Sequence, residues 1–160
     1  FVDIEARTMM MELLFPESLL ITPNSIEARQ LVNNGTEGLD LSIETCVDRF
    51  KGMGCENILI TGSHEDTENV VNTLYGTANQ IIPYYWDRLP GSYHGSGCTL
   101  TSAISAYYAL GLSIGEAVEE AQYFTWHALK NGFKPGMGQL IPNRLFRDND
   151  VEDDGKSTYH

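Results

Sequence analysis

The chain has 160 residues, of which 42% are hydrophobic and 20% charged, and its formal net charge at pH 7 is −12. This length and composition are those of a globular chain that can bury a hydrophobic core. The acidic balance argues against nucleic acid and anionic membranes as partners, because both bind basic faces. No apolar run approaches the roughly 20 residues of a membrane span. Three cysteines without a C-x-x-C pair and four scattered histidines predict a reducing, cytoplasmic setting without a zinc site.

The first part of the chain predicts two strands and two helices. A short apolar run at 19–22 is typical of a buried strand. Asn24 follows it and caps the predicted helix 24–33. Apolar residues at helical spacing predict a second helix at 41–53, and the run 57–61 predicts another buried strand.

The next part of the chain predicts a hairpin and then a helix. Two β-rich runs, 70–75 and 80–86, flank a turn at 76–79. A glycine-rich turn at 91–97 leads into a helix that ends at Gly111.

The order of the elements predicts an α/β layered domain with a mainly parallel sheet and an antiparallel edge. Ser113 and Glu116 form the capping box of a last long helix. The sheet is narrow for so many helices and the chain starts at Phe1, so we expect a domain entered midway, without its amino-terminal part. We expect residues 1–147 to form part of a single domain and residues 148–160 an acidic, flexible tail.

The first candidate site is the turn that opens the helix after residue 94, which reads Gly95, Ser96, Gly97 and Cys98. Two glycines around a small hydroxyl residue let main-chain amides converge on an anion, and the helix terminus adds partial positive charge. The helix dipole also favours the thiolate of a cysteine in the first turn, which could act as a general base. The alternative is a tight turn with a buried, inert cysteine.

The second candidate site follows the two predicted strands. Asn24 and Glu27 are spaced as a helix cap, but they come directly after a strand, where α/β sheets bind ligands. Glu27 could then hold a water of a magnesium ion that bridges phosphates. Thr61 and Gly62 end the other strand and could line the same crevice, or form an ordinary turn.

Three stretches together resemble the hydroxymethylpyrimidine/phosphomethylpyrimidine kinase family of thiamine biosynthesis. Residues 93–107 (YHGSGCTLTSAISAY) resemble its signature, residues 21–28 (ITPNSIEA) are similar to its T-P-N-x-x-E-A stretch, and residues 111–118 (GLSIGEAV) also fit. They occur in the family's order, and the resemblance covers about residues 3–146.

The resemblance implies a ribokinase-like fold, a three-layer α/β/α sandwich. It implies transfer of the γ-phosphoryl group of MgATP to the hydroxymethyl group of an aminopyrimidine and then to its monophosphate. The turn 95–98 would form the anion hole, and Cys98 would stand where most of the superfamily has a base aspartate. The expected partners are therefore ATP, Mg²⁺ and a small pyrimidine, with a homodimer allowed.

The resemblance also assigns roles to the second candidate site. Asn24 and Glu27 would match the N-x-x-E motif associated with phosphate and magnesium, and Thr61-Gly62 would lie in a nucleotide-side loop. Many members have a lysine and paired glycines at 61–63 and a His/Gly-rich segment at 133–139, which this chain lacks. The family's amino-terminal portion and most of its acceptor pocket are absent, so we expect no activity from the chain alone. Pyridoxal or pyridoxine kinase and a non-catalytic phosphate-binding fragment are the rival interpretations.

Overall fold

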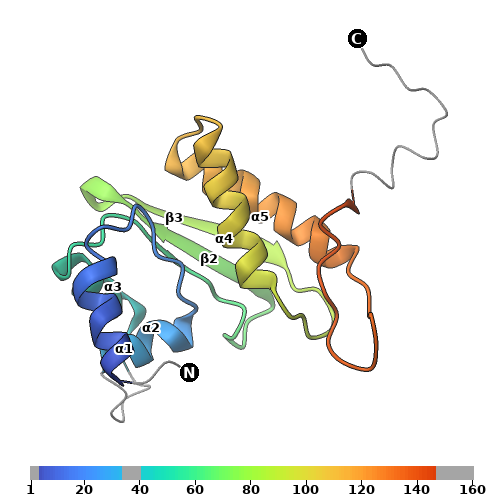
Figure 1. The fold of residues 1–160 in the computed structure, drawn as a ribbon, viewed down its shortest axis with the longest axis horizontal. Coiled ribbons are helices and arrows are strands. Elements are labelled where there is room, and N and C mark those ends of the chain that lie inside the picture. Colours follow the sequence, from blue (N-terminus) through green and yellow to red (C-terminus); the bar gives the residue numbers. More distant parts are fainter. Residues whose placement is uncertain (1–3, 34–40, 147–160) are drawn as a thin grey trace. The chain divides into compact units, whose positions relative to one another are not determined.

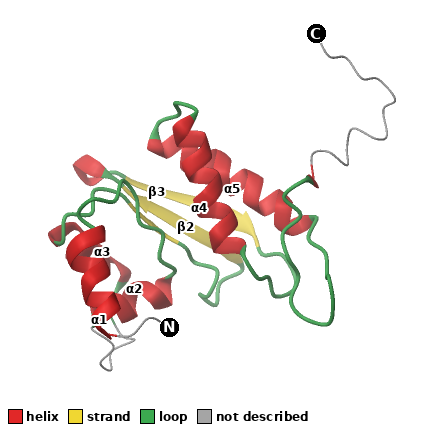
Figure 2. Cartoon of the chain, in the orientation of Figure 1, coloured by secondary structure: helices red, strands yellow, loops and turns green. Residues whose placement is uncertain are grey.

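The computed structural model describes residues 4–33 and 41–146 (Figure 1). The predicted tail at 148–160 lies outside these residues. The chain forms two compact units, one up to Arg88 and the other from Leu89 onward. The described strands, yellow in Figure 2, belong to the first unit, and the two longest described helices, α4 and α5, belong to the second.

The first unit contains three α-helices and a π-helical turn around a hydrophobic core. They are α1 (Ile4–Met9), the π-turn η1 (Met10–Leu14), α2 (Ser25–Val32) and α3 (Ile43–Gly52). In the core, the rings of Phe15 and Phe50 meet edge to face with their centroids 5.9 Å apart. Cys46 and Ile58 are fully buried in the same cluster. The helical spacing of apolar residues in the sequence therefore correctly predicted which face of α3 is buried.

The sheet of the first unit has three strands in the order β1-β2-β3, namely β1 (Ile58–Ile60), β2 (Asn69–Tyr75) and β3 (Ile81–Asp87). The predicted hairpin is confirmed, with Val71 opposite Tyr85. A 3₁₀ turn, η2 (Thr77–Asn79), joins its strands. Ala78 and Asn79 have positive φ in this turn, as a tight chain reversal requires.

The strand pairing differs from the predicted mainly parallel sheet with an antiparallel edge. Both ladders among the described strands are antiparallel. The predicted strand 19–22 contributes only one isolated parallel bridge, between Ile21 and Ile58, and a second isolated bridge joins Asn24 to Thr61. Pro23 has no amide hydrogen and therefore cannot extend this pairing into a ladder, although its carbonyl accepts from Thr61 N at 3.1 Å.

The second unit is built on α4 (Ser96–Ala109) and α5 (Ile114–Lys130), which lie side by side (Figure 1). Small residues on α5, such as Ala117 and Ala121, are fully buried and allow close helix packing. After α5 the chain returns to the turn before α4. There His94 N donates to Leu140 O at 2.8 Å, and Leu140 N donates to Ser92 O at 3.0 Å. These bonds fix the entry to α4.

Candidate functional site

Helix α4 begins with main-chain amides that have no acceptor among the described residues. Gly95 is the N-cap residue with φ +84°, a left-handed conformation that favours glycine. Its carbonyl accepts from Thr99 N at 3.0 Å and from Thr99 Oγ1 at 2.8 Å. The amides of Ser96, Gly97 and Cys98 donate to no acceptor in the described part of the chain. They are therefore available to an external anion.

Gly97 and Cys98 at this terminus are exposed. A methyl group on Gly97 would meet no atom within 4 Å. The Cys98 thiol is free and exposed, which contradicts the alternative of a buried, inert cysteine. Cys46 and Cys55 are buried instead, and burial raises the pKa of both thiols. Cys98 is thus an exposed thiol of the second unit, whereas Cys46 and Cys55 are buried thiols of the first.

Arg144 lies beside the same turn and was missed by the sequence analysis. Its Nε donates to Thr99 Oγ1 at 3.0 Å, and a methyl group on Gly95 would lie 3.3 Å from its Nη2. The guanidinium therefore adds a positive charge near the free amides of α4. The two partners are 45 residues apart, so no local sequence pattern indicates the contact.

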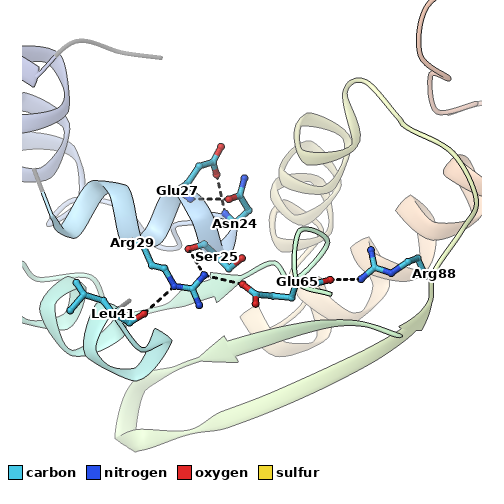
Figure 3. Close-up of polar contacts among 7 residues, drawn as sticks. All are labelled: Asn24, Ser25, Glu27, Arg29, Leu41, Glu65 and Arg88. Atoms are coloured by element: carbon cyan, nitrogen blue, oxygen red, sulfur yellow. Dashed lines mark hydrogen bonds and ion pairs between the residues drawn. The ribbon is translucent and has the colours of Figure 1, made fainter. Parts of the chain in front are cut away.

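In the first unit, Asn24 and Glu27 form the capping box that their spacing predicts (Figure 3). Asn24 Oδ1 accepts from Glu27 N at 2.8 Å, and Glu27 Oε2 accepts from Asn24 N at 2.9 Å. Glu27 Oε1 has no partner within the described ranges. Capping therefore leaves one carboxylate oxygen of Glu27 available to a metal-bound water.

Thr61 and Gly62 lie next to this cap. Ser25 N donates to Thr61 O at 3.1 Å, which places the end of β1 against the start of α2. The Gly62 amide donates to Asn72 Oδ1 at 3.1 Å, so it is not available to a ligand. The structure brings Asn24, Glu27, Thr61 and Gly62 together in the first unit, whereas the turn 95–98 lies in the second.

A pocket of about 360 Å³ in the first unit extends from Glu27 along α1 and α2. The side chain of Gln30 lines it, and its Oε1 is buried without a partner among the described residues. Its lining residues are mostly apolar: Arg7, Met10, Phe15, Ile21, Thr22, Pro23, Glu27, Gln30 and Leu31. The sequence analysis did not predict this pocket, because its lining comes from α1, η1, α2 and the segment that leads into α2.

No three His, Cys, Asp or Glu side chains in the described residues are grouped so as to hold a metal ion. A metal bound near Glu27 would therefore take most of its ligands from phosphate and water, as Mg²⁺ commonly does. Within the described residues, no helix has the length and apolar character needed to cross a membrane.

The chain is an α/β protein with unbonded amides at a helix terminus and an acidic cap after a strand-like segment, and comparison with known proteins identifies its family. Residues 1–143 match the Phosphomethylpyrimidine kinase family, and the chain belongs to it. The chain is 30% identical over 135 residues to the hydroxymethylpyrimidine/phosphomethylpyrimidine kinase of Bacillus subtilis, covering 84% of this chain and 49% of that protein.

Two solved structures show the same fold. The pyridoxal kinase of Staphylococcus aureus in complex with ADP superposes with a TM-score of 0.79 at 29% identity, covering 89% of this chain and 53% of that one. The phosphomethylpyrimidine kinase of Clostridium difficile gives a TM-score of 0.59 at 30% identity, covering 76% of this chain and 47% of that one. The ribokinase-like α/β/α fold class is thus confirmed. The chain spans about half the length of the relatives it matches.

Proposed function

We propose that this chain carries the phosphoryl-transfer part of a kinase that phosphorylates 4-amino-5-hydroxymethyl-2-methylpyrimidine and its monophosphate at the expense of ATP. The observation that carries the proposal is the open, unpaired set of amides at Ser96, Gly97 and Cys98. The family match and the ADP complex of the related pyridoxal kinase support it.

The turn 95–98 and the Asn24–Glu27 cap would have different roles in phosphoryl transfer. The amides of Ser96, Gly97 and Cys98 would donate to the oxygens of the transferring group and stabilise its charge. Cys98 Sγ would accept the proton from the acceptor hydroxyl as the new P–O bond forms and ADP leaves with the electrons of the broken bond. Mg²⁺ would supply charge neutralisation on the phosphates, with Glu27 Oε1 holding one of its waters. Asn24 would fix Glu27 through the capping box.

A pyridoxal or pyridoxine kinase is the second candidate, favoured by the TM-score of 0.79 with the Staphylococcus aureus pyridoxal kinase. The two candidates share the chemistry of the turn and differ in the acceptor. Since the chain spans about half of its relatives, we propose that it lacks acceptor turnover when isolated, and that it binds the nucleotide. The three free cysteines fit the reducing cytoplasm in which we place it.

Two measurements test the proposal. Calorimetry of the chain with MgADP should show saturable binding, and the absence of binding would remove the kinase interpretation. In the full natural protein, turnover of hydroxymethylpyrimidine should exceed that of pyridoxal, and the reverse order would select the second candidate.

The role of Cys98 has its own test in the full natural protein. Cys98→Ala should lower turnover by roughly 10²-fold or more while MgADP affinity stays unchanged, because only proton transfer is lost. Unchanged turnover would exclude the thiol as the base.

A further inference from the structure

The loop at 62–67, which leaves the end of β1, is fixed by side chains from two other elements. Arg88, directly after β3, reaches across to it. Arg88 Nη1 donates to Ser63 O at 2.9 Å, Nη2 donates to Glu65 O at 2.8 Å and Nε donates to Thr67 O at 3.1 Å. One guanidinium thus holds three carbonyls of a single loop (Figure 3 shows the contact with Glu65).

Arg29 of α2 fixes the same loop from its other side (Figure 3). Its Nη1 lies 2.9 Å from Glu65 Oε1, and its Nε donates to Leu41 O at 3.0 Å. The neighbouring Ser25 hydroxyl and then the Arg29 guanidinium hold the pKa of Glu65 below its ordinary value. The carboxylate of Glu65 therefore stays charged at neutral pH, and the loop stays tied to the helix that carries the Asn24–Glu27 cap.

These contacts bond the carbonyls of the loop and leave some of its amides without an acceptor among the described residues. The carbonyls of Ser63, Glu65 and Thr67 accept from Arg88. The amides of Ser63, His64 and Asp66 donate to no acceptor in the part of the chain that the structure describes. These amides are therefore available as donors to a ligand, and unbonded main-chain donors of successive residues suit phosphate oxygens.

The position of the loop indicates the same ligand chemistry. It follows β1 at the point where Thr61 meets the start of α2, the edge at which α/β folds bind ligands. The Gly62 amide is already bonded to Asn72, so a ligand here must be contacted by the residues that follow Gly62. An exposed ion pair adds little to global stability. The effect of the two arginines is thus mainly on the geometry of the loop.

We propose that Arg29 and Arg88 are positioning residues that hold the 62–67 loop so that the amides of Ser63 and His64 bind a phosphate group of the adenine nucleotide. This inference rests on the proposed kinase function and adds to it a phosphate contact in the first unit.

The test compares Arg88→Met with Lys51→Met in the full chain. Both substitutions remove one positive charge, but the Lys51 side chain has no polar contact within the described ranges.

We expect Arg88→Met to weaken MgADP binding roughly tenfold, which calorimetry measures directly. Hydrogen exchange at 62–67 should become faster, and Lys51→Met should change neither quantity. Glu65→Ala, which breaks the Arg29 contact and leaves Arg88 in place, should act in the same direction and serves if Arg88→Met does not fold.

The outcomes separate this inference from the proposed function. Wild-type affinity in a variant whose loop exchanges faster would overturn the positioning role and leave the kinase function intact. An equal loss in Lys51→Met would show a general effect of charge and would also overturn it. If the unmodified chain binds no MgADP, both the inference and the proposed function are wrong.

Discussion

Gly95 and Gly97 are two residues apart and are glycine for different reasons. Gly95 needs its positive φ of +84°, so alanine there is strained by about 1 kcal/mol. A methyl group on Gly97 meets no atom within 4 Å, and alanine favours a helix over glycine by up to about 1 kcal/mol. We therefore expect Gly97→Ala to keep or raise the melting temperature while lowering MgADP affinity, because the methyl group occupies the space of a phosphate oxygen. Gly95→Ala should lower the melting temperature. Undiminished MgADP affinity in a folded Gly97→Ala variant would show that the turn does not bind phosphate.

The Glu27→Gln substitution replaces one side-chain oxygen and can therefore separate the capping role of Glu27 from its proposed role in metal binding. In Glu27→Gln the side-chain oxygen can still accept from Asn24 N, since glutamine also serves in a capping box. The charge that would attract a hydrated magnesium ion is lost. We expect an unchanged melting temperature and a smaller gain in ADP affinity on adding Mg²⁺, measured by titrations with and without a chelator. Glu116→Gln is the matched control, because Glu116 Oε2 accepts from Ser113 N at the same distance of 2.9 Å. An equal magnesium effect in both variants would leave Glu27 with capping alone.

The residues of the site were predictable where the signal was local. The capping pair and the glycine turn with Cys98 could be found from spacing, because both structures form within four residues. Arg144 could not be found, because its contact with Thr99 spans 45 positions. The local pattern also could not show that the Gly62 amide is bonded to Asn72, which depends on the register of β1 and β2.

The same distinction holds for whole elements. Helices with strong caps were predicted to within a few residues, as the Ser113–Glu116 box at the start of α5 shows. The hairpin of β2 and β3 was predicted from two β-rich runs around a short turn. The segment 19–22 is also apolar but forms only a bridge to β1, since Pro23 supplies no amide hydrogen to extend the pairing into a ladder. Leu19 in this segment is 42% exposed, so apolar composition alone predicted neither its burial nor its pairing.

Gly62 is required by the close approach of two elements. A methyl group at Gly62 would lie 2.2 Å from Val71 O, a main-chain atom of β2 that cannot move without breaking the ladder. We expect Gly62→Ala to lower the free energy of unfolding of the first unit by about 1–3 kcal/mol or more, the cost known for overpacked cores. Urea denaturation measures the loss. Gly52→Ala is the control, because a methyl group there meets no atom within 4 Å. If Gly62→Ala unfolds at the wild-type urea concentration, this contact does not constrain the end of β1.

At the scale of the molecule, the fold class followed from the order of elements together with the family resemblance, and the family match confirms it. The chain carries 22 acidic and 10 basic residues. Three of the arginines, Arg29, Arg88 and Arg144, contact loops or helix termini that we assign to phosphate binding. Three of the ten basic residues thus lie at the proposed sites of an otherwise acidic molecule.

This distribution of charge predicts how salt affects nucleotide binding. The net charge of −12 repels a phosphate ligand at long range, whereas main-chain amides attract it only at contact. Raising the salt concentration from about 10 mM to about 150 mM shortens the Debye length from roughly 30 Å to roughly 8 Å, so the repulsion is screened before the contacts are. We expect the association rate of MgADP, followed by stopped-flow fluorescence at saturating Mg²⁺, to rise over this range. The affinity should stay constant or increase, and uncharged adenosine, as the control ligand, should show no effect of salt on its association rate. A steep loss of affinity with salt would mean that an exposed basic surface holds the nucleotide, and the assignment to main-chain donors would then be wrong.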